Sequence, residues 1–200
     1  MKNVINNLPD ILSGKINSKV GFSQKFFDRN IFFIERGFIA VSSKTVASRK
    51  SVLILGKNDL FPLLDQTYKP LENLNYTALS DIEYMGIPIK KLLEYDTDLM
   101  DKLIYENLRS ALLNSFKIQE IAHHNKTHDK LKVALSMLES KIGTDGDYLA
   151  LPSRMNITRL SHLLGCSRES LSSCLKSEYW LKNFSRKNGR LLFKKIAFLK

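Results

Sequence analysis

Short apolar runs separated by glycine, asparagine, aspartate and proline characterise the chain from Phe26 to Ile89. They include FFDRNIFFIERGFIAVSS, SVLILG and YTALSDIEYMGIPI, which are rich in β-branched and aromatic residues. Runs of this kind at close spacing are typical of antiparallel strands in a small barrel or sandwich. Pro9 followed by Asp10 indicates a short opening helix, and the apolar spacing of IKKLLEYD after Pro88 indicates another.

From Asp96 the apolar positions recur at steps of mainly three and four, which is the period of an amphipathic helix. With Thr97 as the N-cap and Asp98 in the first turn, the pattern predicts one helix of about 25 residues and roughly 37 Å. Because a small β domain needs no helix of that length, we expect it to pack against its copy in a homodimer. The alternative is a helix that lies across its own barrel. The predicted seam contains Leu99, Leu103, Leu108, Leu112 and Phe116.

A polar segment at residues 123–130, HHNKTHDK, interrupts the helical period and is predicted to be a hinge. His124 and His128 stand four apart and could share a helix face, but no third ligand of suitable type accompanies them. No metal site is therefore predicted. Residues 129–142 then show an apolar face typical of another helix, which Gly143 ends.

The segment MNITRLSHLLGCSRESLSSCLKS combines two short helical patterns around Gly165. The first runs from Asn156 to Leu164, and the second follows Ser167 as its cap. A helix, a glycine turn and a second helix form the helix-turn-helix layout, in which the second helix enters the major groove with its N-terminal residues at base edges. Arginine can donate two hydrogen bonds to guanine, glutamate can accept from cytosine, and serine can serve either base. The predicted base-reading residues are Arg168, Glu169, Ser172 and Ser173.

Residues 184–195 read as two short strands joined at Asn188-Gly189, the strongest short-range signal for a β-hairpin. After a helix-turn-helix, such a hairpin is the wing. Polar and basic side chains at its tip and at the ends of the second helix are placed to touch DNA phosphates, which orient a protein on the duplex without reading sequence. The predicted phosphate-contacting residues are Ser167, Lys176, Arg186, Lys187 and Arg190.

The charge of the chain is concentrated in its last quarter. The formal net charge is +11, from 31 Lys and Arg against 20 Asp and Glu. Residues 151–200 hold 11 basic and 2 acidic side chains, a net +9, whereas residues 1–150 hold 20 and 18, a net +2. Such a density attracts a polyanion at long range and gains affinity by releasing condensed counterions. With the base-reading layout, it predicts double-stranded DNA as the partner; a basic surface that serves only solubility is the alternative.

Composition excludes several other classes. Hydrophobic residues make up 44% of the chain and charged residues 26%, which is ordinary for a globular protein. The apolar runs are far shorter than the roughly 20 residues that span a bilayer, and the start MKNVINNLPD has no apolar signal core, so we expect no membrane partner and a cytoplasmic location. No phosphate loop, nucleophile elbow or paired carboxylates indicate an enzyme. Cys166 and Cys174 are expected to be reduced and structural.

GCSRESLSSCLKS resembles the recognition-helix segment of the bacterial cyclic AMP receptor and fumarate-nitrate regulator (Crp/Fnr) family of transcription factors, in which a glycine, a small residue and Ser-Arg-Glu open the DNA-reading helix. The resemblance extends back through ITRLSHLL and the long helix to ILGKNDLFPLLD, and covers about residues 30–195. It implies that Arg168 and Glu169 are the base-reading pair and that Ser173 replaces an arginine. It also allows RNA polymerase as a further partner.

The resemblance implies an α+β fold with an N-terminal jelly-roll β-barrel, a long dimerisation helix and a C-terminal winged helix-turn-helix. The corresponding domains are residues 1–95, an effector-like barrel; residues 96–125, a dimerisation helix and hinge; and residues 126–200, a DNA-binding domain. This agrees with the organisation that the hydrophobic pattern predicts.

The chain departs from the family at the effector site. Cyclic-nucleotide binders place a glutamate after the glycine of the phosphate loop and an Arg-Ser pair later, because the cyclic phosphate needs a positive partner and hydroxyl donors. Here GKNDLF carries Lys57 and Asn58, and the Arg-Ser place falls near Glu72 and Asn73, where a carboxylate would repel the phosphate. Iron-sulfur members need cysteines in the first domain, and none precedes Cys166. We therefore expect no activation by cyclic AMP and no cofactor.

Three functional hypotheses follow. The leading one is a homodimeric, sequence-specific DNA-binding transcription regulator. The second is a ligand-gated sensor, in which an unknown small molecule in the N-terminal barrel shifts the dimer geometry; a pocket there would favour it and a filled barrel would oppose it. The third is a protein that binds DNA mainly through charge and displaces another regulator, with little sequence preference.

Overall fold

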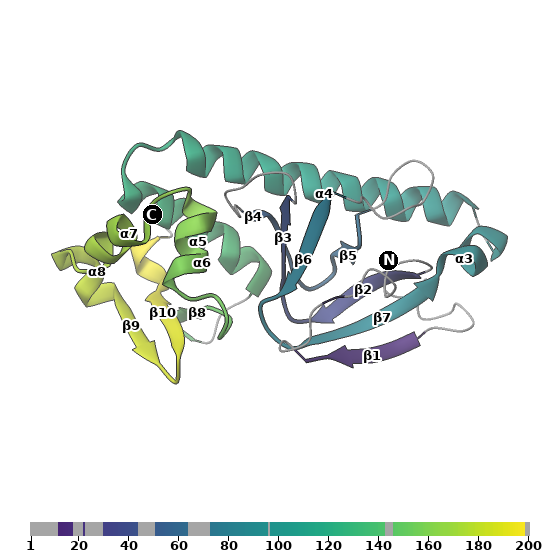
Figure 1. Cartoon of the computed structure of the whole chain (residues 1–200), viewed down its shortest axis with the longest axis horizontal. Helices are drawn as coiled ribbons and strands as arrows, with labels where there is room; N and C mark the ends of the chain where they lie inside the picture. The colour runs from purple at the N-terminus through teal and green to yellow at the C-terminus, as the bar shows by residue number, and fades with distance from the viewer. Residues whose placement is uncertain are drawn as a thin grey trace.

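The computed structural model describes residues 12–17, 22, 30–43, 51–63, 73–95, 97–142 and 146–198. Figure 1 shows two β-sheets at one end, short helices with a small sheet at the other, and one long helix, α4, that runs along both. We call residues 12–95 the N-terminal module and residues 127–198 the C-terminal module. The opening helix predicted at Pro9 lies outside the described residues.

Two sheets form the N-terminal module, with strand orders β1-β7-β2-β5 and β4-β3-β6. The described strands in both sheets pair antiparallel, which confirms the prediction from the hydrophobic pattern. The strands of the first sheet are β1 (Leu12–Ile16), β2 (Asn30–Arg36), β5 (Leu60–Phe61) and β7 (Ile82–Pro88). Those of the second are β3 (Ile39–Ser43), β4 (Ser51–Leu55) and β6 (Leu74–Ala78).

Strand β3 faces two hydrophobic clusters at once. Because side chains alternate along a strand, Ile39 and Val41 join the cluster inside the N-terminal module, together with Phe61. Ala40, between them, joins the cluster of the C-terminal module. Ile54 lies opposite Ala40 in β4 and joins that same outer cluster. The sheet is therefore covered on both faces around Ala40 and Ile54, which explains why β4 reads as a nearly continuous apolar run.

Three helices follow the strands: α3 (Ile89–Tyr95), α4 (Thr97–His123) and α5 (Thr127–Ile142). Helix α4 has 27 residues, close to the predicted length, and begins at Thr97, which is thus its first residue and not the N-cap before it. It turns Leu103 and Ile121 inward, at 0% and 1% exposed. Among the described helices, none combines the length and apolarity needed to cross a membrane.

The hinge predicted at residues 123–130 is wrong in extent. Helix α4 includes the start of that segment and α5 begins at Thr127, so only residues 124–126 lie outside a helix. The first turn of α5 has a tertiary partner, because His128 packs edge-on against Tyr179 with ring centroids 4.9 Å apart. A polar segment can therefore be helical where one of its side chains packs on another element.

The C-terminal module continues with β8 (Tyr148–Ala150), α6 (Ile157–Leu164), α7 (Arg168–Leu175), α8 (Glu178–Asn183), β9 (Phe184–Lys187), β10 (Arg190–Lys194) and the 3-10 helix η1 (Lys195–Ala197). The predicted hairpin is present, and its turn residues Asn188 and Gly189 have φ of 51° and 72°. The sheet has a third strand that the sequence pattern did not reveal, since β8 pairs with β10.

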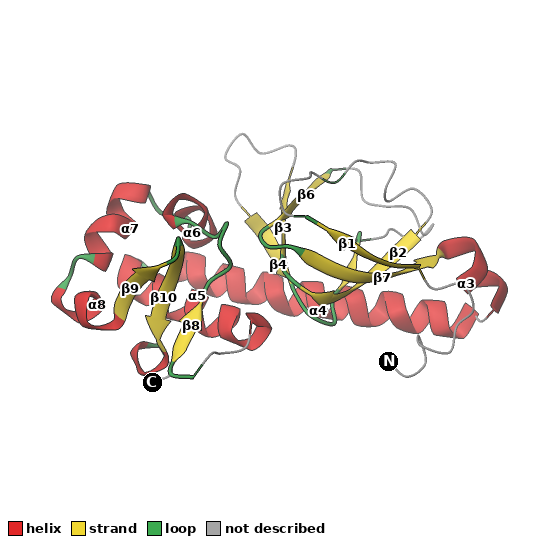
Figure 2. Ribbon diagram, turned by 90° about the horizontal axis from the view of Figure 1, so that it is seen from below, coloured by secondary structure: helices red, strands yellow, loops and turns green. Residues whose placement is uncertain are grey.

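The two modules pack directly on each other. Ala40, Ile54 and Leu79 of the N-terminal module belong to the same hydrophobic cluster as most of the C-terminal core. The backbone N–H of Arg154 donates to the carbonyl of Leu79 at 3.3 Å, which adds a hydrogen bond between the modules. Figure 2 shows both modules lying along α4, with α5 between α4 and the small C-terminal sheet. The orientation of the C-terminal module therefore depends on contacts with the sheets as well as on the helical connection.

Candidate nucleic-acid interface

Two capped helices meet at a tight turn in the C-terminal module. Asn156 precedes α6, and its side-chain oxygen accepts the backbone N–H of Arg159 at 2.9 Å. Ser167 precedes α7, and its Oγ accepts the backbone N–H of Ser170 at 3.0 Å. Gly165 has φ 60° and ψ 36°, in the left-handed region that favours glycine. The predicted arrangement of helix, glycine turn and second helix is therefore present.

The apolar face of α7 is held against the rest of the module. Leu171 and Leu175 are 0% and 4% exposed and share a cluster with Leu160 and Leu164 of α6. Complete burial of a leucine side chain contributes roughly 1.5–3 kcal/mol. Because this face is held inward, the opposite, polar face of α7 points to solvent.

Of the predicted base-reading residues, Glu169 and Ser173 lie on that polar face, while Arg168 and Ser172 lie at the edge of the buried face. Arg168, Glu169 and Ser173 are exposed, and Ser172 is half-buried. Arg168 and Ser172, one helical turn apart, line a hollow of about 290 Å³ together with Arg186 of the β9–β10 hairpin. The residues that line this hollow include two arginines and no carboxylate. The structure thus brings α7 and the hairpin, which are separate in sequence, to one positively charged surface.

The same hollow contains two residues that sequence reasoning missed. Asn156 and Thr158, at the start of α6, line it beside Arg168. The cap at Asn156 is visible in the sequence, but its proximity to the hairpin depends on how α6 packs on its neighbours. The N-terminus of a helix is also a favourable place for a phosphate, because its first backbone N–H groups lack helical partners.

Arg159 adds a partly buried positive charge behind this surface. Its Nη1 donates to the carbonyl of Arg154 at 3.3 Å. Burial lowers the pKa of Arg159, and the neighbouring charge of Arg154 lowers it further. It also lines a second hollow, of about 360 Å³, between α6 and the outer face of β3 and β6, where Ser42 and Thr77 contribute hydroxyl groups.

All five predicted phosphate-contacting residues are exposed: Ser167, Lys176, Arg186, Lys187 and Arg190. Arg186 and Lys187 end β9 immediately before the hairpin turn, so their side chains extend from the part of the hairpin that projects from the module. Ser167 also caps α7, so its backbone and hydroxyl lie at the end of the helix that an anion would approach.

Arg190 is held by its own chain. Its Nε donates to the carbonyl of Leu151 and its Nη2 donates to the carbonyl of Ala150, each at 3.0 Å. These bonds occupy two of the five N–H groups of the guanidinium and fix its plane. The side chain thus joins β10 to the end of β8 and the residue after it, and a phosphate contact by Arg190 stays a prediction.

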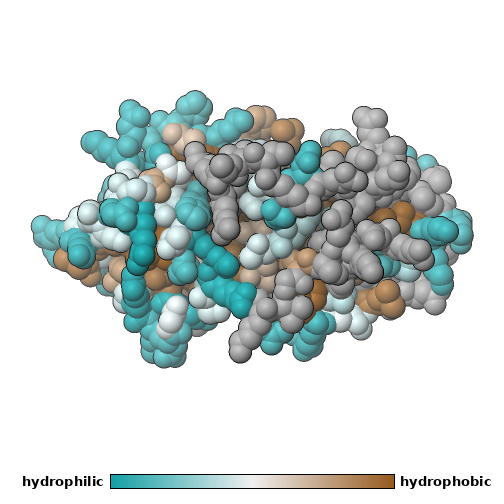
Figure 3. All heavy atoms as spheres, viewed as in Figure 1, coloured by the Kyte–Doolittle hydropathy of each residue, from teal (hydrophilic) through white to brown (hydrophobic). Residues whose placement is uncertain are grey.

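Helix α4 carries an exposed apolar stripe. Leu108, Leu112 and Phe116 are 50%, 56% and 57% exposed, and their spacing of four residues places them on one side of the helix. In Figure 3, apolar side chains appear along the edge of the molecule where α4 runs. Leu103 is fully buried within its own chain, which removes it from the predicted seam. The side chain of Leu99 lies outside the described part of the structure.

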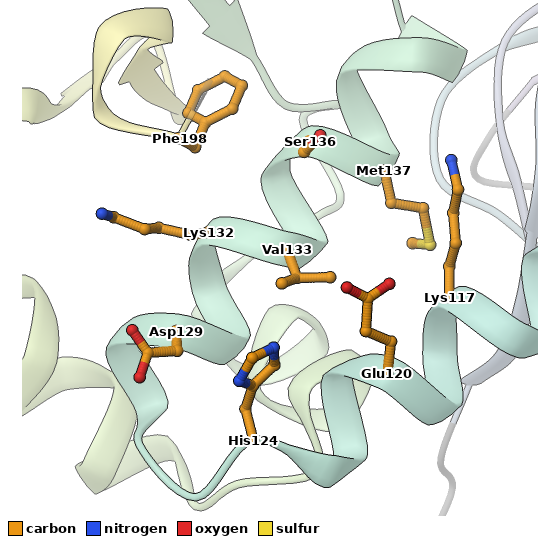
Figure 4. A pocket seen from close by; sticks show the side chains of 9 residues that line it. All are labelled: Lys117, Glu120, His124, Asp129, Lys132, Val133, Ser136, Met137 and Phe198. Atoms are coloured by element: carbon orange, nitrogen blue, oxygen red, sulfur yellow. The ribbon is translucent and has the colours of Figure 1, made fainter. Parts of the chain in front are cut away.

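A hollow of about 480 Å³ lies between the end of α4, α5 and Phe198 (Figure 4). Lys117 and Lys132 line it together with Glu120 and Asp129, so its charges are mixed and favour no ligand of one sign. Across the described chain, no three His, Cys, Asp or Glu side chains gather as a metal site would require.

Aromatic rings pack the inside of the N-terminal module where the structure describes it. The ring centroid of Phe32 lies 5.3 Å from that of Phe61 and 5.1 Å from that of Tyr84. Tyr76 is half-buried, and burial raises its pKa to about 12. Its hydroxyl accepts the backbone N–H of Leu63 at 2.9 Å. This packing favours a filled interior over a ligand pocket in the described part of the module.

The predicted effector positions are only partly described. Lys57 is exposed, Asn58 has φ 70° in the turn before β5, and Asn73 is exposed. Glu72 lies outside the described residues. The expectation that cyclic AMP does not activate the protein therefore stays a prediction.

Comparison with known sequences gives a partial match. No protein-family model matches the chain. Two curated proteins, from two strains of Leptospira interrogans, are 28% identical to it over 189 residues, covering 87% of this chain and 51% of theirs. Both are named ATP phosphoribosyltransferase regulatory subunit. The chain thus spans about half the length of these curated relatives.

Comparison with solved structures covers nearly the whole chain. A cyclic nucleotide-binding domain containing protein from Listeria monocytogenes EGD-e matches with a TM-score of 0.70 at 14% identity, over 98% of this chain and 96% of that one. A CRP-family transcriptional regulator from Thermus thermophilus matches with a TM-score of 0.71 at 11% identity, over 92% and 93%. FixK2 from Bradyrhizobium japonicum matches with a TM-score of 0.67 at 14% identity, over 93% and 92%.

The chain has the Crp/Fnr fold. Other neighbours include a second regulator from Thermus thermophilus, of the CRP/FNR family, with a TM-score of 0.67 at 12% identity. The predicted resemblance is therefore confirmed at the level of the fold, although the identities are low. Within this Crp/Fnr-like architecture, α7 and the β9–β10 hairpin are the elements whose polar side chains meet at one hollow.

Proposed function

We propose that the chain is a homodimeric, sequence-specific DNA-binding transcription regulator. The observation that carries this proposal is the hollow where Arg168 and Ser172 of α7 meet Arg186 of the hairpin, on a surface that no lining carboxylate opposes. Arginine can form a bidentate pair with guanine, and a hairpin arginine can bind a phosphate of the same duplex. The residues proposed to read bases are Arg168, Glu169, Ser172 and Ser173.

The proposed architecture divides the chain as the sequence predicts. Residues 1–95 form a jelly-roll effector-like barrel, residues 96–125 a dimerisation helix with its hinge, and residues 126–200 a winged helix-turn-helix. The two packed sheets, the long α4 and the α6–α7–hairpin arrangement support this division. Residues proposed to contact phosphates are Ser167, Lys176, Arg186, Lys187 and Arg190, with Asn156 and Thr158 added from the structure.

The homodimer is proposed from the exposed stripe on α4. Three large apolar side chains at 50–57% exposure on one helix face would gain stability by pairing with a second copy. A two-fold dimer would also present two α7 helices to two half-sites about one helical turn of DNA apart. RNA polymerase is a further partner that this function would allow. We expect neither cyclic AMP nor a cofactor to be required.

The proposal is tested by selecting bound DNA from a random pool, with the purified protein, no added ligand, and two salt concentrations. Enrichment of a palindrome is the expected result. Enrichment only when cell extract is added would favour the ligand-gated sensor instead. Binding without any enrichment, together with a steep loss of affinity at the higher salt concentration, would favour a protein that binds through charge alone.

The Leptospira matches support a second candidate, a regulatory subunit of an enzyme. The supporting observation is the 28% identity over 87% of this chain to proteins of that name. This candidate predicts that the protein co-purifies with an ATP phosphoribosyltransferase catalytic subunit and changes its rate. It also predicts that Arg168→Ala leaves this association unchanged, because α7 would then have no DNA to read.

A further inference from the structure

The carboxylate of Asp59 joins three parts of the molecule. Asp59 lies between β4 and β5 in the N-terminal module and is 7% exposed. Its Oδ1 accepts the hydroxyl of Ser110, in the middle of α4, at 3.0 Å. Its Oδ2 meets Nζ of Lys141, in the last turn of α5, at 2.5 Å. One buried carboxylate therefore bonds the N-terminal module, the long helix and the C-terminal module to one another.

The turn that carries Asp59 is itself held in place. The backbone N–H of Gly56 donates to Oδ2 of Asp59 at 2.8 Å. The backbone N–H of Ile34 donates to the Asp59 carbonyl at 3.0 Å, which ties the turn to β2. A Cβ added at Gly56 would lie 3.5 Å from Cβ of Lys141, so α5 packs closely over the glycine. The carboxylate is therefore presented to α5 from a fixed position.

The low exposure of this ion pair makes it sensitive to the loss of either partner. The side chains of Lys141 and Asp59 are 16% and 8% exposed. Removing one partner of a buried pair leaves an uncompensated charge, which is strongly destabilising, whereas exposed pairs contribute little. The pair of Lys15 and Glu83, within the N-terminal module, is of the exposed kind, at 80% and 36%.

The junction is connected to both functional surfaces. Leu131 and Leu135 of α5 pack in the same cluster as Leu171 of α7, so a displacement of α5 would carry α7 with it. Ser110 belongs to α4, the helix that carries the exposed stripe, and it faces Asp59 on the side of the helix away from Leu108 and Leu112. In this arrangement Arg168, Glu169 and Ser173 of α7 are exposed.

We propose that Asp59 is a positioning residue for DNA recognition. Through Lys141 and Ser110, it sets the orientation of α7 relative to α4. In a dimer whose interface is formed by α4, this orientation fixes the distance and angle between the two α7 helices. Asp59 touches no DNA in this scheme, and it acts only on sites that require both helices at once. The inference rests on the proposed function of the chain.

The first test needs no DNA. Hydrogen–deuterium exchange of the full chain reports on the Arg154 amide, which donates to Leu79 across the modules. In Asp59→Asn this amide should exchange at least about 10-fold faster, because the modules separate more often. Glu83→Gln makes the same chemical change in an exposed pair and should leave the rate unchanged. An unchanged rate in Asp59→Asn would overturn the proposal.

The second test compares the selected palindrome with a single half-site. Asp59→Asn should weaken binding to the palindrome by about 10-fold or more and change binding to the half-site by less than about 2-fold, because only the palindrome depends on the relative orientation of two helices. Glu83→Gln should bind both as the unaltered protein does. An equal loss on both DNAs, or tighter binding to the palindrome, would contradict a positioning role.

Lys141→Met removes the same ion pair from the α5 side while keeping the aliphatic part of the side chain. If Asp59→Asn does not fold, both tests are made with Lys141→Met. The double variant should be no weaker on the palindrome than the weaker-binding single variant, because both changes remove one interaction. Additive losses would contradict the proposal. If the unaltered protein selects no sequence, the proposed function fails, and the exchange of the Arg154 amide still decides whether Asp59 holds the modules together.

Discussion

Nε1 of Trp180 donates to Nδ1 of His128 at 3.0 Å, which joins the helix after α7 to the first turn of α5. Trp180 is fully buried, and its ring meets Phe193 edge-on with centroids 5.8 Å apart. These two contacts hold α5, α8 and β10 together, and the three elements support the position of α7.

Replacing Trp180 with Phe should lower the free energy of unfolding by about 1–3 kcal/mol, because the change removes the donor to His128 and part of a packed ring. Urea unfolding measures the loss. Tyr179→Phe is the comparison: it removes a hydroxyl that donates to the carbonyl of Ala197 at 2.8 Å, at a residue that is 39% exposed. Its cost should be about 1 kcal/mol or less. An equal loss of unfolding free energy in the two variants would show that the buried indole of Trp180 stabilises the protein no more than the hydroxyl of Tyr179 does.

Arg168→Ala should reduce binding to the selected DNA more than binding to random DNA. Losing a bidentate base contact costs about 1–3 kcal/mol of discrimination. Lys187→Ala should weaken binding to both DNAs about equally and lower the slope of log affinity against log salt by about 1, because only a phosphate contact is lost. Titrations at several salt concentrations measure both effects. Specific binding that survives Arg168→Ala intact would mean that α7 is not the reading helix.

Leu112→Glu should convert the dimer to monomers, because it places a charge in the middle of the exposed stripe of α4. Light scattering reads the molar mass directly. Leu181→Glu is a matched control: Leu181 is 64% exposed, slightly more than Leu112 at 56%, but it lies on α8 in the C-terminal module. The control should keep the mass of the dimer. A dimer that persists in Leu112→Glu would refute a seam along this stripe.

The two cysteines should react slowly with a thiol reagent at pH 8. Burial raises the pKa of Cys166 and of Cys174, so the reactive thiolate is a smaller fraction there than for an ordinary cysteine. The rate should rise as the pH approaches the raised pKa values, and it should be faster at every pH in the urea-unfolded chain. The reaction rate is measured from the change in absorbance as the thiols react with an aromatic disulfide. Reaction as fast in the folded protein as in urea would contradict the packing around these thiols.

Much of the C-terminal module could be predicted from sequence because its signals are local. Asn156, Gly165 and Ser167 each determine the backbone within a few residues, through a side-chain cap or a positive φ. Asn188-Gly189 does the same for the hairpin. The hinge was predicted too long because a distant contact, not a local signal, accompanies the helix there: the partner of His128 stands 52 residues away in the chain.

The candidate site could be predicted only in part. The exposure of Ser173 follows from the helical period, because burying Leu171 and Leu175 turns it outward, whereas Arg168 shares their side of the helix and is exposed as the first residue of α7. Arg190 could not be distinguished from Arg186 and Lys187, as all three are basic residues around one turn. Only the pairing of β10 with β8 shows that the carbonyls of Leu151 and Ala150 hold its guanidinium.

By itself the sequence determined the order of the elements apart from β8 and α8, the caps of α6 and α7, the turns and the concentration of positive charge, because these depend on neighbours along the chain. The tertiary structure decided which side of α4 is buried, since Leu103 and Leu112 are both leucines in one apolar pattern and only packing separates them. It also decided that Asp59 meets Lys141, 82 positions later. No local preference encodes such a contact, which forms when the packing of two modules removes both charges from water.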